Sequence, residues 1–216
     1  MPTARERLSH LLALAAEGPG RRAALAGEVA ELVLDWPADG PEAMRGPLMA
    51  LLELTVREAD WETRARLAAR MGGHPELPLH LINDFYLAGP PRVRREILLR
   101  NEIADEPPQA VNPPDCQALV AAARANAPGF AATLGACFAI SNETALAILN
   151  DPSGEPFAAL CKGAHADRAT FSTIMVLHGA GAAALPVFDT VPQRAAERLV
   201  AHWRRQAPHH VAAAAE

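Results

Sequence analysis

The chain has 216 residues, of which 50% are hydrophobic and 21% are charged, a balance typical of a folded globular protein rather than of a disordered chain. Its net charge is −5, whereas a protein that tracks duplex nucleic acid needs a basic excess to neutralise phosphates, so nucleic acid is not the expected partner. Aromatic residues make up only 5%, while alanine and leucine, both strong helix formers, are abundant. Composition therefore favours an all-helical protein.

Proline and glycine punctuate the chain at short intervals, and the apolar residues between them recur at helical spacing. The first helix is expected from about Thr3 to Ala16, and a second runs to Trp36. A third helix carries Met44 to Val56, and further helices are predicted near residues 60–71, 78–87, 91–100, 114–126, 129–140, 142–150, 155–164, 167–178 and 190–206. N-cap positions are predicted at Asp115, Ser141 and Asp167, whose side-chain oxygens accept hydrogen bonds from first-turn N–H groups. No segment alternates as a strand would, so the predicted fold class is all-α.

Two segments match each other at an offset of thirty residues. In TRARLAARMGGHPELP and VRREILLRNEIADEPP, the matched pairs are Arg64 with Arg94, Leu67 with Ile97, Arg70 with Arg100, and Pro78 with Pro108. A helix followed by a proline turn, repeated in this way, is typical of stacked helical hairpins. We therefore predict one domain, an α-solenoid, with N-terminal helices (1–57), repeats (58–178), a C-terminal capping helix (179–206) and a flexible tail (207–216).

The stretches from Glu62 to Pro108 and from Asp151 to Leu177 resemble an uncharacterised, mainly alphaproteobacterial group of HEAT-like proteins, domain-of-unknown-function family 2336. The likeness extends from about residue 40 to 178. The resemblance implies a helical-repeat fold, and the predicted architecture is a HEAT-like, right-handed solenoid of helical hairpins. It implies no catalytic residue, because none is established for that family.

Arginines are dense in the segment PPRVRREILLRNE, residues 90–102. Arg70 and Arg100 lie near predicted helix C-termini, where a guanidinium bonds free carbonyls, and they are interpreted as structural. The remaining candidates for a binding surface are Arg64, Arg66, Arg92, Arg94 and Arg95.

Two interpretations of these five arginines stay open. One is a solvated helix face, paired with the acidic residues Glu62, Glu96 and Glu102. The other is a docking strip for an acidic protein segment or a phosphate, because the planar guanidinium binds carboxylate and phosphate in two-point fashion.

Other segments predict no chemistry. HGAGAAAL (178–185) partly fits a dinucleotide fingerprint but is interpreted as a glycine helix stop, and DPSGEP (151–156) as a turn. His74 and His80 are poorly spaced for a metal, and Cys116, Cys137 and Cys161 are interpreted as buried hydrophobes in a reducing cytoplasm. No cofactor, metal, export signal or membrane span is expected, the longest apolar stretch being about a dozen residues against roughly 20 needed.

The predicted function is a non-enzymatic, cytoplasmic protein-binding scaffold or regulatory adaptor. The first alternative is a sensor for a small phosphorylated ligand that uses the same arginines. The second is a nucleic-acid enzyme that excises bases, for which Asp60–Trp61 and Asp84–Phe85–Tyr86 supply the residue types. The last helix, with Leu199, Val200 and Trp203 on one stripe, is expected to cap the repeats; exposed, it would bind a partner or a second copy in a homodimer.

Overall fold

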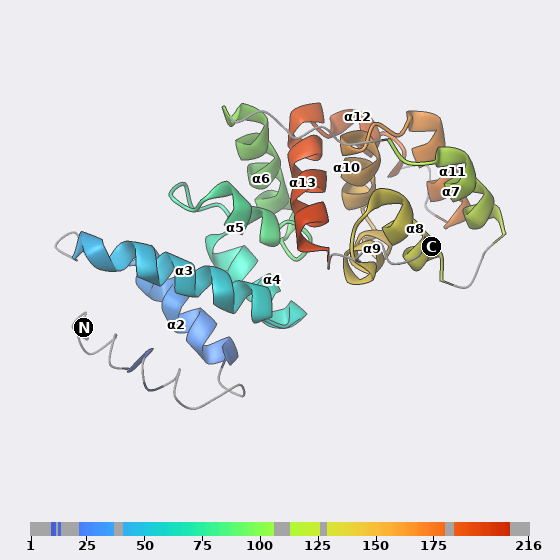
Figure 1. The fold of residues 1–216 in the computed structure, drawn as a ribbon. Coiled ribbons are helices and arrows are strands. Elements are labelled where there is room, and N and C mark those ends of the chain that lie inside the picture. The colour runs from blue at the N-terminus through green and yellow to red at the C-terminus, as the bar shows by residue number, and fades with distance from the viewer. Residues whose placement is uncertain are drawn as a thin grey trace, which may run out of the picture. The chain divides into compact units, whose positions relative to one another are not determined.

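The computed structural model describes residues 10, 11, 13, 22–36, 41–105, 113–125, 129–179 and 184–207, and all regular structure within these ranges is helical (Figure 1). The helices are α2 (Arg22–Leu34), α3 (Glu42–Glu58), α4 (Trp61–Met71), α5 (Leu79–Asp84), α6 (Pro91–Ile103), α7 (Cys116–Arg124), α8 (Phe130–Phe138), α9 (Asn142–Leu149), α10 (Glu155–Gly163), α11 (Arg168–Leu177), α12 (Val187–Thr190) and α13 (Gln193–Gln206). The chain divides into two compact units, residues 1–97 and 98–216, and α6 runs from the first into the second. The all-α prediction is confirmed. Arrangement as a single solenoid domain stays a prediction.

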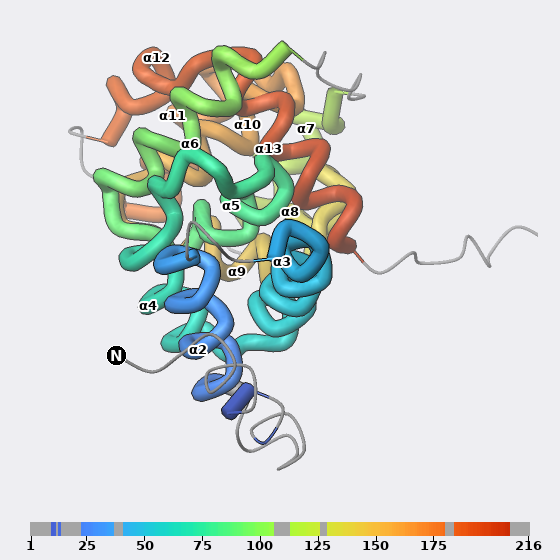
Figure 2. Tube along the Cα trace, turned by 90° about the vertical axis from the view of Figure 1, so that its left-hand side faces the viewer, coloured from blue at the N-terminus to red at the C-terminus, as the bar shows by residue number. Residues whose placement is uncertain are grey.

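The first unit is built on α2, which packs against α3 and α4, while α5 also packs against α3 (Figure 2). Helical spacing puts Leu25, Val29 and Leu32 of α2 inside, and each is at most 8% exposed. The largest fully buried side chains of this unit are Leu52, Met71, Leu77, Leu81, Ile82, Phe85, Tyr86 and Ile97. Removing such a side chain from water stabilises the fold by roughly 1.5–3 kcal/mol, which is what holds these short helices together.

Side-chain caps start several helices as the sequence predicts. The Thr144 N–H donates to Ser141 Oγ over 3.0 Å, and the Thr170 N–H donates to Asp167 Oδ1 over 2.6 Å. Asp115 accepts from the first two N–H groups after Cys116, over 3.1 and 3.0 Å. All three predicted N-caps are therefore confirmed, and each satisfies N–H groups that have no partner within the helix.

Two hairpins in the second unit, α8–α9 and α10–α11, share one turn geometry. Just after the first helix of each hairpin, Ala139 and His165 adopt left-handed φ values of 56° and 59°. The next N–H then bonds back into the helix, from Ile140 to the Gly135 carbonyl (2.9 Å) and from Ala166 to the Cys161 carbonyl (2.8 Å). The hairpins repeat at an offset of 26 residues, which the sequence analysis did not find.

Burial follows the same offset. The buried pairs are Ala131 and Phe157, Leu134 and Leu160, Gly135 and Cys161, Phe138 and Ala164, Ile140 and Ala166, Ala145 and Phe171, and Ile148 and Ile174. At several of these places one hairpin has a large residue where the other has a small one, as with Phe138 and Ala164. The same backbone unit therefore recurs while most of its packing residues change.

Helix α13 packs against α10, and both views show the two helices side by side (Figures 1 and 2). Gly163 allows the close approach, because a Cβ there would lie 2.3 Å from the Ala196 carbonyl oxygen. All six residues from Arg198 to Trp203 are buried. The apolar stripe of α13 is thus used inside the protein and leaves no exposed stripe for a partner or a second copy.

Several predictions differ from the structure in detail. The helix expected over 78–87 ends at Asp84, and the short helix α12, between two prolines, was not predicted. Cys161 is buried as expected, but Cys116 and Cys137 are only half-buried, which corrects the interpretation of all three as core residues. The first predicted helix, apart from residues 10, 11 and 13, and the tail beyond Ala207 lie outside the described residues.

In the described ranges, no single helix is long and apolar enough to cross a membrane. The pair α8 and α9 reaches that length together but bends by 115° at its break.

Candidate binding surface on α6

Arg94 is the innermost of the predicted binding residues. Arg94 is only 8% exposed. Its guanidinium lies over the buried Tyr86 ring, 5.9 Å from the ring centroid. Nε donates to the Gly89 carbonyl over 2.9 Å, and an Nη donates to the Leu87 carbonyl over 3.2 Å. The side chain therefore ties the loop before α6 to the helix and is not available on a surface.

Arg64 donates to the equivalent pair of carbonyls one repeat earlier. Its Nη donates to the carbonyls of Ala59 (3.1 Å) and Arg57 (3.4 Å), which lie five and seven residues before it. Gly89 and Leu87 lie five and seven residues before Arg94. The offset of thirty in the sequence thus marks two arginines with one structural task.

The structure buries Arg94, one residue of the predicted exposed strip, whereas Arg64 is only partly buried. The physical reason is that carbonyls at the end of a helix or turn lack internal partners, and a guanidinium supplies several donors to them. A signal for Arg94 was present in the sequence, because Arg94, Ile97, Leu98 and Asn101 are spaced i, i+3, i+4 and i+7, and all are at most 8% exposed.

Arg70 is structural, but not in the way predicted. It forms a two-point pair with Glu31 of α2 over 2.9 and 3.0 Å, rather than bonding helix carbonyls. The hydrogen bond to Glu31 raises the pKa of Arg70 above its ordinary value. The equivalent Arg100 is partly buried on α6.

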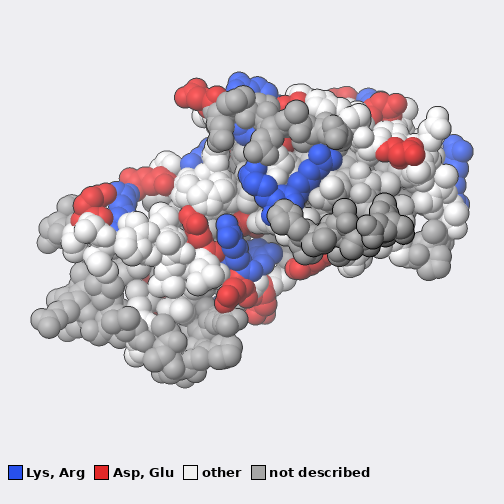
Figure 3. Space-filling model, in the orientation of Figure 1, with Lys and Arg blue, Asp and Glu red and all other residues white. Residues whose placement is uncertain are grey.

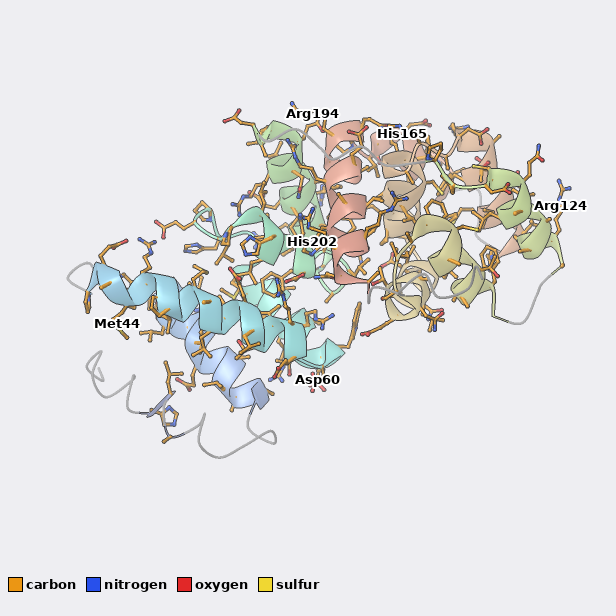
Figure 4. All side chains as sticks on the ribbon, viewed as in Figure 1. Met44, Asp60, Arg124, His165, Arg194 and His202 are labelled. Atoms are coloured by element: carbon orange, nitrogen blue, oxygen red, sulfur yellow. The ribbon has the colours of Figure 1, made fainter. Side chains whose placement is uncertain are left out.

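Arginines of α13 also bond helix ends, which sequence reasoning missed. The buried Arg198 donates to the carbonyls of Asn101 and Ala104 at the end of α6, and Arg194 also donates to Ala104, over 3.2 Å (Figure 4). Arg204 donates to the last carbonyl of α8, that of Phe138, over 2.8 Å, and burial lowers the pKa of Arg204. The arginines described so far, Arg100 apart, therefore bond backbone carbonyls or a carboxylate within the protein and stabilise its fold.

Arg92 and Arg95 are the exception. Both are exposed, and they are neighbours on α6 because residues three apart share a helix face. Within the described part of the chain, neither makes a hydrogen bond or an ion pair. Arg66, the fifth candidate, is exposed on α4 and donates to Thr63 Oγ1 over 3.2 Å.

Glu96 and Glu102, two of the acidic residues expected to pair with these arginines, form no ion pair with Arg92 or Arg95 in the part of the chain that the structure describes. Glu102 accepts a hydrogen bond from the Ala195 N–H over 3.2 Å. Glu96 lies one turn from Arg92, yet among the described residues no ion pair joins it to Arg92 or Arg95. Of the five arginines of the predicted strip, Arg92 and Arg95 are thus an exposed pair on α6 and Arg66 is exposed on α4.

The start of α6 differs in charge from the start of α4. Asp60 caps α4 by accepting from the Thr63 N–H over 2.7 Å, and Glu62 lies in the first turn (Figure 4). That hydrogen bond, then one from the Thr63 hydroxyl, and more weakly the charges of Arg66 and Arg64, lower the pKa of Asp60. The first turn of α6 holds no acidic residue and contains Arg92.

Most side chains of the other candidate segments, where the structure describes them, are built into the fold. The Asp60 carboxylate is engaged as a helix cap, and Phe85 and Tyr86 are fully buried in the core. Gly179 has a left-handed φ of 78° directly after α11, so the predicted helix stop at HGAG is confirmed, and Asp151 and Ser153 form a turn that ends at the left-handed Gly154. His80 pairs with Glu53 over 2.6 Å, and no cluster of three metal-ligating side chains occurs among the residues described.

On the face shown in Figure 3, basic side chains lie in small groups among acidic and uncharged ones. No single basic surface extends over the described part of this face. Comparisons with models of protein families, with curated proteins and with solved structures gave no match.

Proposed function

We propose that this protein is a non-enzymatic scaffold or adaptor that binds an acidic segment of a partner protein through Arg92 and Arg95. One observation carries the proposal. Two exposed arginines stand at the start of α6 and have no partner among the described residues.

That position is unfavourable for a positive charge. The N-terminus of a helix carries roughly half a positive charge, and a cation there is destabilising by about 0.3–1 kcal/mol. The arginines that hold the fold each bond a carbonyl or a carboxylate, whereas Arg92 and Arg95 bond neither among the residues that the structure describes. A carboxylate bound between them would meet two guanidinium groups and the first-turn N–H groups of α6, which offsets the repulsion.

We propose, together with this function, that the protein is a HEAT-like α-solenoid related to domain-of-unknown-function family 2336. Two internal repeats support it: the arginine contacts shared by α4 and α6 at an offset of 30, and the hairpins α8–α9 and α10–α11 at an offset of 26. Both offsets are shorter than the roughly 40 residues of HEAT units. Repeated hairpins supply extended surfaces for partners, which suits an adaptor.

The test is a capture experiment from the native organism with wild type and the double variant Arg92→Glu/Arg95→Glu. Arg57→Glu/Arg124→Glu is the matched control, since it makes the same charge change at two exposed arginines (Arg124 is labelled in Figure 4). A partner held by wild type and by the control, and lost by the α6 variant, is then purified and its Kd measured. We expect the α6 variant to weaken binding at least tenfold, and added salt to weaken wild-type binding.

A partner that binds the α6 variant as tightly as wild type would overturn the proposal. Phosphate compounds form a second arm, because the same site chemistry accepts a phosphate. If inorganic phosphate or a nucleotide raises the melting temperature of wild type and not of the α6 variant, the arginine pair is a small-ligand site and the adaptor proposal falls.

A further inference from the structure

The face of α6 that carries Arg92 and Arg95 continues into two exposed apolar residues. Leu99 is 55% exposed and Ile103 is 68% exposed. Both lie on α6 itself, so their places relative to the arginines follow from helix geometry alone.

Helix geometry puts these four residues in one row. At about 100° per residue, Arg95, Leu99 and Ile103 all lie within roughly 60° of Arg92 around the helix axis. The buried residues of α6 lie on the opposite side and are Val93, Arg94, Ile97, Leu98 and Asn101. The outward row is therefore charged at its N-terminal end and apolar at its C-terminal end.

We infer that this row binds an amphipathic helix of a partner protein, with acidic residues set about two turns away from a pair of apolar residues. The inference rests on the proposed function and narrows it to one kind of segment. Leu99 and Ile103 are one turn apart, about 6 Å along the axis, which matches apolar residues spaced i, i+4 on a partner helix.

Charge complementarity predicts which residues the partner helix has opposite Arg92 and Arg95. The mean position of Leu99 and Ile103 lies about 11 Å along the axis from that of Arg92 and Arg95, at a rise of 1.5 Å per residue. Acidic residues seven or eight positions from the apolar pair would reach the guanidinium groups. A purely apolar helix would leave the two arginines against an apolar surface, which costs desolvation energy without an ion pair in return.

The experiment is selection from a library of helix-forming peptides displayed on phage, with the full-length protein as target. Enriched peptides are synthesised, and their Kd values are measured by fluorescence anisotropy for wild type and for three double variants. The variants are Leu99→Asp/Ile103→Asp, Arg92→Glu/Arg95→Glu and, as a control, Leu146→Asp/Val176→Asp, which alters two apolar residues that are 44% and 60% exposed elsewhere. Circular dichroism checks each fold, and Leu99→Ala/Ile103→Ala replaces the aspartate variant if that one unfolds.

We expect enriched peptides to combine the acidic residues and the apolar pair, and each α6 variant to weaken their binding at least tenfold while the control stays within about twofold. Peptides that lose binding only to the arginine variant would overturn this inference and leave the proposed function standing. Peptides that lose binding only to the Leu99/Ile103 variant would overturn both. The absence of enrichment would overturn this inference alone, because the proposed function does not require a helical segment. If wild type sediments as a dimer and Leu99→Asp/Ile103→Asp does not, a second copy covers the row and the inference also fails.

Discussion

Helices α4 and α6 contain the same arginine contact but begin in opposite ways. Arg64 and Arg94 both reach back to the carbonyls five and seven residues before them. Yet α4 starts with an aspartate cap and a glutamate in its first turn, as helix electrostatics favours, while α6 starts with proline and arginine. The arginine contact that the two helices share holds the fold. Arg92 and Arg95, which stand only at the start of α6, make no hydrogen bond or ion pair within the described ranges.

The largest effect is expected from Arg94→Ala. Removing this buried guanidinium leaves the carbonyls of Leu87 and Gly89 without these donors and empties the space over Tyr86, so the free energy of unfolding should fall by about 3 kcal/mol. Urea titration followed by circular dichroism measures the change. Arg94→Lys keeps the charge but not the planar fork and should recover only part of the loss. A loss below about 1 kcal/mol would show that Arg94 does not hold the loop.

A smaller effect is expected from Arg64→Ala. Arg64 is partly exposed, so water replaces its bonds to the carbonyls of Arg57 and Ala59, and the loss should be about 1 kcal/mol. The same titration, run beside Arg94→Ala, ranks the two arginines. Equal losses in the free energy of unfolding would contradict the expectation that the buried Arg94 stabilises the fold more than the partly exposed Arg64.

The start of α4 predicts a dependence on pH. Since the pKa of Asp60 is lowered in the folded protein, its charged cap contributes stability in full above the ordinary pKa near 3.8, and that contribution is lost as the pH falls through the folded pKa. Asp60→Asn keeps an acceptor oxygen but does not titrate. We therefore expect wild type to lose more stability than Asp60→Asn between pH 6 and pH 3, measured from urea midpoints at each pH. Parallel losses would contradict an ionised cap.

The smallest effect on stability is expected from Arg92→Ala/Arg95→Ala. Because both side chains are exposed and lie near the positive end of the helix dipole, the free energy of unfolding should change by less than about 0.5 kcal/mol, or rise slightly. Thermal melting beside Arg94→Ala gives the contrast. A loss above about 1 kcal/mol would assign these arginines to the fold as well and remove the reason to propose a binding role for them.

The positions of the helices were readable because apolar periodicity, prolines and N-cap residues are local signals. Ser141 and Asp167 cap the helices they were predicted to cap, since the accepting N–H groups are only three residues away. The hairpin repeat at an offset of 26 was not readable, because its matched positions exchange large and small residues such as Phe138 and Ala164. Two buried positions keep their residue, Leu134 with Leu160 and Ile148 with Ile174, but most of the buried matched positions do not.

The sequence by itself determined that this protein is helical, where most of its helices begin, and that Arg64 and Arg94 occupy equivalent places. Only the tertiary structure decided what those arginines do. A guanidinium sits at the end of a long flexible side chain, and its partners are fixed by where the preceding backbone turns, as Gly89 and Leu87 do beside Arg94. Arg92, Arg94 and Arg95 look alike in the sequence, and folding buries one of them and leaves the other two facing water.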